Sequence, residues 1–271
     1  MSSPPSTSAT SPSSSFTPAR PRHPAALAFQ SRSAAAISSS SKISRKVAEL
    51  GWRQAHSHSE YYPFASSSSS SCSPPISLSV RQKQCGEQDG TGTGAVVWNA
   101  AHVMSTYLCG SPEQVEGKKV ADLGTGTGLT GLVALNLGAR EVTFTDVGPV
   151  LELTRENVSS NCSDELVSKT SVSEYWWGSG TLGKHCYDMV LVADCILPKL
   201  YPIEPLVVAI DELLVKGDAG VCFVSYEHRT WFEFDPREKF AELCREKKLS
   251  LSTVPRDDLG AVAEDIIIWK V

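Results

Sequence analysis

The 271-residue sequence contains no apolar run that approaches the roughly 20 residues of a membrane-spanning helix. It also contains no Cys-x-x-Cys pair. Its eight cysteines are scattered, and several, such as Cys195 and Cys222, lie inside apolar runs. A free thiol in such a run behaves as a small hydrophobic side chain. These absences argue against a zinc site or a disulfide framework, and we expect neither a membrane span nor a bound metal.

Acidic residues are almost absent from the N-terminal segment. Residues 1–80 contain two acids against seven lysines and arginines, and 26 serines. Such a Ser-rich, Pro-punctuated segment buries too little apolar surface to offset the entropy of ordering it. We therefore predict a disordered leader over residues 1–75 and one domain over residues 76–271. The leader's composition is typical of a plastid transit peptide and equally of an extension without a targeting role. We expect the cytoplasm, with the plastid as the alternative.

The remainder of the chain is short of basic residues. Residues 81–271 have 18 lysines and arginines against 28 acids, a formal charge of −10. A nucleic-acid partner would require a basic face, so this composition argues against one. It is compatible with docking a basic protein surface that carries a lysine.

The hydrophobic pattern alternates between strands and helices. Apolar runs such as MVLVA (189–193) are typical of parallel strands that are covered on both faces. The predicted strands are 76–80, 119–123, 141–145, 189–193, 220–225, 249–254 and 266–271. The predicted helices are 97–108, 129–137, 150–160, 203–215 and 237–246. This order predicts an α/β fold with an open, doubly wound sheet, in which the last two strands form an antiparallel pair at one edge.

Two glycine-rich stretches look alike, and their context separates them. Residues 90–94 follow a polar segment, which predicts a flexible loop. Residues 124–128 follow the strand KKVADL and precede the helix LTGLVALNL. At a strand–turn–helix junction of this kind, backbone N–H groups can receive an anion, and glycine lets the backbone approach a ligand closely.

The acids around the second stretch favour S-adenosylmethionine as the ligand. Asp122 precedes the turn in a DxGxGxG pattern, where its carboxylate can meet the ammonium of the methionyl moiety through water. Asp146 ends the next strand, where it can accept both ribose hydroxyls. The segment GTGLTG (126–131) also satisfies the dinucleotide pattern, so a nicotinamide cofactor stays as the alternative.

Several motifs together resemble a known family. The chain contains GAVVWNAA (94–101), VADLGTGTGLTGL (120–132), FTDV (144–147), Trp-Gly at 177–178, MVLVADCIL (189–197), SYEHR (225–229) and EDIIIW (264–269). In this order they are similar to the class I seven-β-strand protein-lysine methyltransferases, in particular the methyltransferase-like 21 group. The resemblance covers residues 76–271 and implies a Rossmann-like, doubly wound, mostly parallel seven-stranded sheet. It also implies an S-adenosylmethionine-dependent enzyme that acts on a lysine of a protein partner.

The resemblance implies a set of cofactor-binding residues. They are Trp98, Asp122, Gly124, Thr125, Gly126, Asp146, Trp177 and Ala193. Trp98 would border the cofactor pocket, and Trp177 and Ala193 would flank the adenine or the bound cofactor. From the sequence alone, Trp98 can equally be a core residue on the apolar stripe of its helix.

Asp194 is the predicted catalytic residue, because the family places an acid there in a (D/E)xx(Y/F) motif. The chain departs from that motif, since Leu197 stands where the family has an aromatic side chain. Either Tyr201 supplies the ring from the next turn, or the acceptor differs from a peptidyl lysine, as in a small-molecule N-methyltransferase. Glu227, with His228 and Arg229, could line the acceptor site or form a surface ion pair. A non-catalytic S-adenosylmethionine-binding protein is a further alternative.

Overall fold

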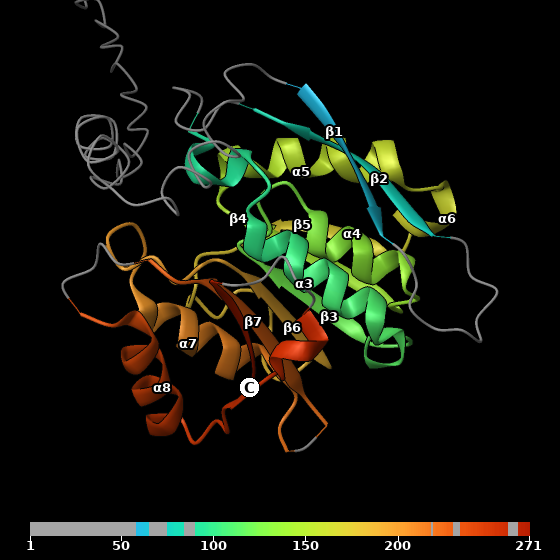
Figure 1. The fold of residues 1–271 in the computed structure, drawn as a ribbon. Helices are drawn as coiled ribbons and strands as arrows, with labels where there is room; N and C mark the ends of the chain where they lie inside the picture. The colour runs from blue at the N-terminus through green and yellow to red at the C-terminus, as the bar shows by residue number, and fades with distance from the viewer. Residues whose placement is uncertain (1–57, 65–74, 84–89, 218, 230–233, 260–264) are drawn as a thin grey trace, which may run out of the picture.

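A seven-stranded sheet organises the chain (Figure 1). The computed structural model describes residues 58–64, 75–83, 90–217, 219–229, 234–259 and 265–271. The strand order is β5-β4-β3-β6-β7-β9-β8, in which the first five strands are parallel and the last two are antiparallel. The predicted doubly wound, mostly parallel seven-stranded sheet with an antiparallel edge is confirmed.

The secondary structure has the following bounds. The strands are β1 (His58–Phe64), β2 (Ile76–Gln82), β3 (Lys119–Leu123), β4 (Glu141–Asp146), β5 (Thr170–Glu174), β6 (Met189–Ala193), β7 (Val221–Glu227), β8 (Ser252–Thr253) and β9 (Ile266–Lys270). The α-helices are α3 (Asn99–Gly110), α4 (Leu129–Asn136), α5 (Gly148–Asn161), α6 (Asp164–Val167), α7 (Ile203–Leu213) and α8 (Pro236–Glu246). The described residues also include three short 3-10 helices: η2 (Gly92–Ala95), η3 (Pro112–Gln114) and η4 (Arg256–Leu259).

The strand order reverses in the middle of the sheet. β3 pairs with β4 on one side and with β6 on the other, so the chain leaves β3 for one edge and returns beside it. In open α/β sheets, ligands bind outside the carboxyl ends of the strands at such a reversal. The topology therefore directs attention to the loops that follow β3, β4 and β6.

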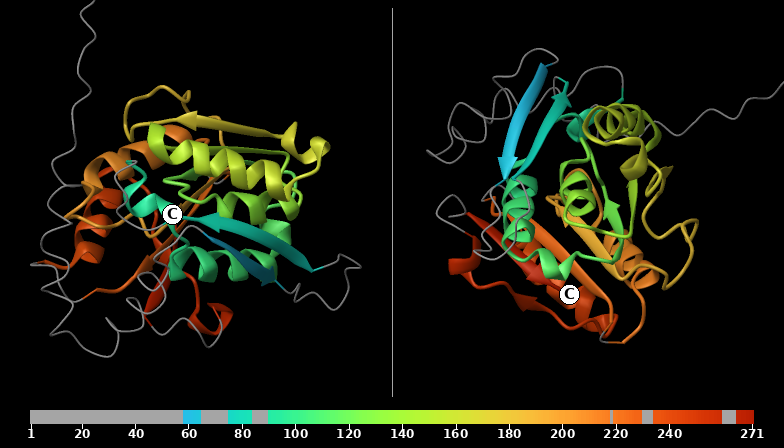
Figure 2. Two further views of the ribbon diagram at one scale, coloured as in Figure 1. Left: turned by 90° about the horizontal axis from the view of Figure 1, so that it is seen from above. Right: turned by 90° about the vertical axis from the view of Figure 1, so that its right-hand side faces the viewer.

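Helices cover both faces of the sheet, as Figure 2 shows from two further sides. In β6, Met189 and Leu191 belong to a core shared with α3 and α4, whereas Val190 and Val192 belong to a core shared with α7 and α8. Successive residues of a strand point to opposite faces, so a continuous apolar run is what a sheet covered twice requires. Among the described helices, none has both the length and the apolar character needed to cross a bilayer.

An antiparallel β1–β2 hairpin begins earlier than we predicted. Its register pairs Phe64 with Ile76 and His58 with Gln82. Residues 58–64 thus form a strand inside the segment predicted to be a disordered leader, and that part of the prediction is wrong. The strand was missed because its sequence gives no sign of the partner strand that supplies its hydrogen bonds. The rest of the predicted leader, apart from Pro75, lies outside the described residues.

Asparagines of α5 bind the hairpin. The side chain of Asn157 accepts a hydrogen bond from the Arg81 backbone N–H at 2.8 Å and donates one to the Arg81 carbonyl at 3.0 Å. Asn161 makes the same pair of bonds with Ser79, one turn later. The two amides thereby complete backbone hydrogen bonds that a neighbouring strand would otherwise provide.

Other differences from the predictions concern polar or short elements. β5 (TSVSE) was not predicted, because its half-buried residues show no apolar run. The predicted strand 249–254 is a strand only at Ser252–Thr253. The first helix begins at Asn99, which leaves Trp98 at its N-cap and not on its apolar stripe.

The hairpin should contribute measurably to stability, because Phe64 is only 3% exposed and packs in the core with Leu78 and Val80. We expect Phe64→Ala to lower the free energy of unfolding by about 3 kcal/mol. Chemical denaturation of the full chain would measure this loss. The exposed neighbour Pro63, substituted by alanine, is the control and should cost much less. Equal, small losses for both variants would contradict the packing of β1.

Candidate active site

A cavity of about 440 Å³ lies at the carboxyl ends of β3, β4 and β6. Its volume is within the range of small-molecule sites. Both glycine-rich stretches, the start of α3, the residues after β5 and β6, and residues 200–205 contribute to its wall. The predicted site residues that line it are Trp98, Gly124, Thr125, Gly126, Asp146, Trp177, Ala193, Asp194, Leu197 and Tyr201.

The turn after β3 requires glycine for its backbone conformation, and at Gly124 and Gly126 also for lack of space. Gly124, Gly126 and Gly128 have φ angles of +64°, +54° and +90°, which L-residues rarely adopt. A Cβ on Gly124 would lie 2.7 Å from the Cys195 sulfur and 3.3 Å from the Trp177 ring. At Gly124 and Gly126, the backbone itself therefore forms part of the cavity wall.

Asp122 faces away from the cavity, contrary to our prediction. Its carboxylate is 1% exposed and accepts hydrogen bonds from Thr125 Oγ1 (2.6 Å), Thr130 Oγ1 (2.9 Å) and the Gly131 N–H (3.0 Å). Burial raises its pKa, and these three donors stabilise its ionised form. Asp122 is absent from the cavity wall. Its role in the structure is to join the turn to the start of α4.

Asp146 lies at the end of β4 and lines the cavity. Its carboxylate accepts hydrogen bonds from the backbone N–H groups of Gly126 (2.9 Å) and Val147 (2.7 Å). Burial raises its pKa to about 6, against the effect of these two donors. Each carboxylate oxygen has a second lone pair, so the group can still accept a pair of hydroxyls from a ligand.

The first glycine-rich stretch is part of the same wall, although we predicted a flexible loop. Residues Gly92–Ala95 form η2, and the stretch packs against the second one. A Cβ on Gly126 would lie 3.1 Å from the Gly94 carbonyl oxygen, and a Cβ on Gly94 would lie 2.9 Å from Val150. The sequence showed both glycine clusters, but only the tertiary structure shows that the backbone at Gly94 packs against Gly126.

Aromatic side chains border the cavity on two sides. The Trp98 indole N–H donates to the Thr93 carbonyl at 3.0 Å, which holds the ring beside the first glycine stretch. The Trp177 ring lies edge-on to Tyr201, with centroids 5.9 Å apart. The Tyr201 hydroxyl is hydrogen-bonded to the Thr93 hydroxyl. Thr93, which we did not predict, thus connects both aromatic groups.

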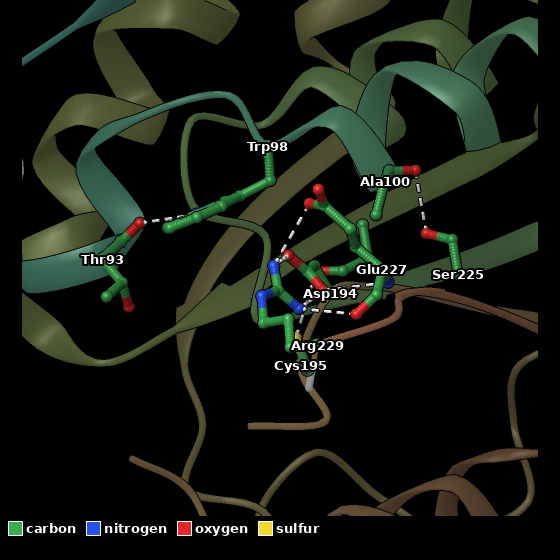
Figure 3. A network of polar contacts seen from close by, with 9 residues as sticks. Thr93, Trp98, Ala100, Asp194, Cys195, Ser225, Glu227 and Arg229 are labelled. Atoms are coloured by element: carbon green, nitrogen blue, oxygen red, sulfur yellow. Dashed lines mark hydrogen bonds and ion pairs between the residues drawn. The ribbon is translucent and has the colours of Figure 1, made fainter. Parts of the chain in front are cut away.

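Asp194 follows β6 with a φ of +57° and is among the residues that line the cavity, while its side chain is fully buried. Arg229 contacts both of its carboxylate oxygens, and Glu227 also contacts Arg229 (Figure 3). Glu227, His228 and Arg229 are not among the lining residues. The ion pair that we considered for the surface is therefore a buried one. In the described part of the chain, no three His, Cys, Asp or Glu side chains form a metal-ligand group.

Comparison with known proteins identifies the family. A family model described as lysine methyltransferase matches residues 79–245. The chain is 37% identical over 155 residues to the protein N-lysine methyltransferase METTL21A of Danio rerio, covering 55% of this chain and 70% of that protein. The chain belongs to the lysine methyltransferase family. This family membership confirms the resemblance that the motifs indicated.

Two further relatives support the same assignment. METTL21A of Mus musculus is 40% identical over 107 residues, which cover 39% of this chain and 49% of that protein. The EEF1A lysine methyltransferase 3 of Xenopus tropicalis is 32% identical over 164 residues, covering 58% of this chain and 71% of that protein. The chain thus spans about half the length of one of these relatives and about 70% of the others.

The cavity of this lysine methyltransferase fits S-adenosylmethionine, the cofactor of its class. The backbone at Gly124–Gly128 can approach the methionyl part without steric hindrance. Asp146 can accept the ribose hydroxyls, and the Trp177 ring and Ala193 offer apolar surface to the adenine. The glycine turn, the Asp146 carboxylate and the apolar wall thus suit the methionyl part, the ribose and the adenine of the cofactor, respectively.

The raised pKa of Asp146 predicts that cofactor affinity depends on pH. Binding of a diol favours the ionised carboxylate, so the affinity should be constant above pH 6 and fall about tenfold per pH unit below it. Asp146→Asn should weaken binding about 10- to 100-fold and remove this dependence. Isothermal titration calorimetry between pH 5 and 8 measures both effects.

Glu141 provides a control at the opposite end of β4, where it pairs with Lys119 at the surface. Glu141→Gln should keep the wild-type affinity and pH dependence. A wild-type affinity that does not change between pH 5 and 7 would contradict the proposed role of Asp146.

Proposed function

We propose that this protein transfers a methyl group from S-adenosylmethionine to the Nζ atom of a lysine in a protein partner. The observation that carries the proposal is that Asp194 lies in the wall of the cavity that also contains the glycine turn and Asp146. One cavity thereby contains both the cofactor-binding features and an acid suited to an amine. Family membership and the names of the relatives, which are protein lysine methyltransferases, support the same activity.

Methyl transfer to lysine requires that the amine first lose its proton to solvent. For a lysine of pKa 10.4, this costs about 4.6 kcal/mol at pH 7. A carboxylate alone would raise the lysine pKa, whereas burial and a nearby positive charge would lower it. We therefore assign to Asp194 the orientation of the incoming nitrogen through a charge-assisted hydrogen bond, and not the role of a strong base.

The reaction is an in-line displacement. S-adenosylmethionine, when bound, supplies a methyl group on a positively charged sulfur that leaves as a neutral thioether with the electron pair of the broken C–S bond. The nitrogen lone pair forms the new N–C bond. The chain's own contribution is to hold that lone pair in line and to exclude water, which can lower the barrier by several kcal/mol.

Tyr201 is proposed to supply the aromatic wall that Leu197 does not. Both residues line the cavity, and Leu197 is 5% exposed. The backbone N–H of Tyr201 donates to the Leu197 carbonyl at 2.8 Å, so one helical turn separates the two positions. The ring is held by Trp177 and by the Thr93 hydroxyl. A ring in this place can contact an ammonium or methylammonium group through its π-face.

The proposed activity predicts a labelled protein when the full chain is incubated with radiolabelled S-adenosylmethionine and a cell extract. Asp194→Asn should reduce the rate of labelling about 100-fold, because the nitrogen is no longer held in line. The exposed acid Asp164, substituted by asparagine, is the control and should keep the wild-type rate. The chain should include residues 58–64, since these form β1.

Two other outcomes would contradict protein-lysine methylation. Label that appears only in small solutes would indicate a small-molecule N-methyltransferase, the alternative that Leu197 favours. Cofactor binding without label in any acceptor would indicate a binding protein without catalysis.

Tyr201 variants test the aromatic wall separately. Tyr201→Phe removes the hydroxyl that contacts Thr93 and retains the ring, so it should keep most of the activity. Tyr201→Leu removes the ring and should lower kcat/KM about tenfold, the effect of losing a cation–π contact of about 1.4 kcal/mol. Steady-state kinetics on the labelled protein target measure the difference. Equal rates for both variants would contradict the role of the ring.

A further inference from the structure

A buried cluster of three charged side chains adjoins the cavity (Figure 3). The two terminal nitrogens of Arg229 contact the two oxygens of Asp194, with Nη1 to Oδ1 at 2.8 Å. The same guanidinium donates from Nη1 to the Glu227 carbonyl at 2.9 Å and lies 3.3 Å from the Glu227 carboxylate. The side chains of Asp194, Glu227 and Arg229 are 0%, 5% and 8% exposed. At this burial, solvent screens their charges weakly.

The sheet brings these side chains together. β6 and β7 are parallel neighbours in which Ala193 pairs with Ser225, and the Asp194 N–H donates to the Ser225 carbonyl at 2.9 Å. Glu227 is the last residue of β7 and Arg229 follows two residues later. Asp194 and Arg229 therefore lie within two residues of adjacent strand ends, which the sheet holds in place.

The cluster carries one net negative charge, since it has two carboxylates and one guanidinium. Without Arg229, the two carboxylates would face each other in a buried site, and like charges there favour the uptake of a proton. Burial raises the pKa of Glu227, as do Asp194 and Asp265, whereas Arg229 and the side chain of Asn99 lower it. Tyr226 is the further titratable group beside Arg229.

The Trp98 ring contacts the Arg229 guanidinium on another side. The Arg229 Cζ atom lies 5.8 Å from the centroid of the Trp98 ring, which itself lines the cavity. Arg229 is absent from the lining residues, so it contacts Asp194 from outside the cavity wall. Asp194, which does line the cavity, accepts a further hydrogen bond on Oδ1 from the Glu227 backbone N–H at 3.4 Å.

We propose that Arg229 is a positioning residue of the methyl-acceptor site, which holds both oxygens of Asp194 in one orientation and keeps the neighbouring Glu227 ionised. The remaining negative charge then attracts the acceptor's ammonium group to Asp194. The inference rests on the proposed function for the identity of the acceptor. The effect of Arg229 on the ionisation of Glu227 can be measured in the protein without any substrate.

The experiment compares Arg229→Met and Arg229→Lys in the full chain. Carbon-13 NMR titration of the Glu227 carboxyl group, without cofactor, reports its ionisation. In Arg229→Met, this titration should move about one pH unit or more upward, because the guanidinium that lowers the pKa of Glu227 is lost. Arg229→Lys should keep the titration near that of the wild type, because it retains the charge.

Methyl-transfer kinetics give the second readout. Arg229→Met should lower kcat at pH 7 about 100-fold, since Asp194 is no longer oriented, and should shift the acidic limb of the pH–rate profile upward, since Glu227 takes up a proton more readily. Arg229→Lys should recover only part of this loss, because an ammonium group cannot hold two oxygens at once. Arg140→Met is the matched control, as Arg140 forms a surface ion pair with Asp188 and does not line the cavity.

Glu227→Gln keeps the test decisive if Arg229→Met does not fold. It removes the carboxylate on which Arg229 is proposed to act electrostatically and leaves Asp194 paired with Arg229, so the rate should stay nearer to the wild-type rate than that of Arg229→Met. Arg229→Met with an unchanged titration and rate, or Glu227→Gln with as large a loss of rate as Asp194→Asn, would overturn the inference. An increased kcat/KM in Arg229→Met would also overturn it, since Arg229 would then obstruct the acceptor. A wild-type protein that methylates no protein, yet shows the expected titrations, would instead contradict the proposed function alone.

Discussion

The structure of the site depends on a backbone turn that excludes side chains. Where β3 ends, Gly124 lies against the sulfur of Cys195 from the loop after β6 and against the Trp177 ring. Since β3 and β6 are neighbours at the reversal of the strand order, this contact fixes how closely the two loops approach. A single methyl group at Gly124 would force them apart. The depth of the cavity follows from that exclusion.

Three aspartates lie near this turn, and each has a different partner. Asp122 is satisfied by two threonine hydroxyls and a backbone N–H, and it joins the turn to α4. Asp146 is held by two backbone N–H groups and retains a face toward the cavity. Asp194 is paired with Arg229. A buried carboxylate is costly unless it is paired or hydrogen-bonded, so these partners decide which acids can serve a ligand.

The proposed cofactor half and the proposed acceptor half of the cavity differ in how they are built. The proposed cofactor half consists mainly of backbone and of strand ends, which the sheet holds in place. The proposed acceptor half includes Leu197 and Tyr201, which belong to the irregular segment between β6 and α7. A family that shares one methyl donor and many targets can vary this segment without disturbing the sheet.

The order of strands and helices could be predicted from the sequence, because apolar periodicity depends on which faces of each element are buried. The glycine turn could be predicted as well, since few other sequences allow repeated positive φ angles between a strand and a helix. β1 and β5 could not, because a strand without an apolar run is recognised only by its hydrogen-bonding partner.

The orientation of side chains was decided by the tertiary structure. Asp122 and Asp146 both end strands in the sequence pattern, yet hydrogen-bond donors at 125, 130 and 131 turn one of them inward. The first glycine stretch joined the site because Gly94 packs on Gly126. Arg229 was visible in the sequence only as a neighbour of Glu227. Its contact with Asp194, 35 residues away, exists because β6 and β7 are adjacent in the sheet.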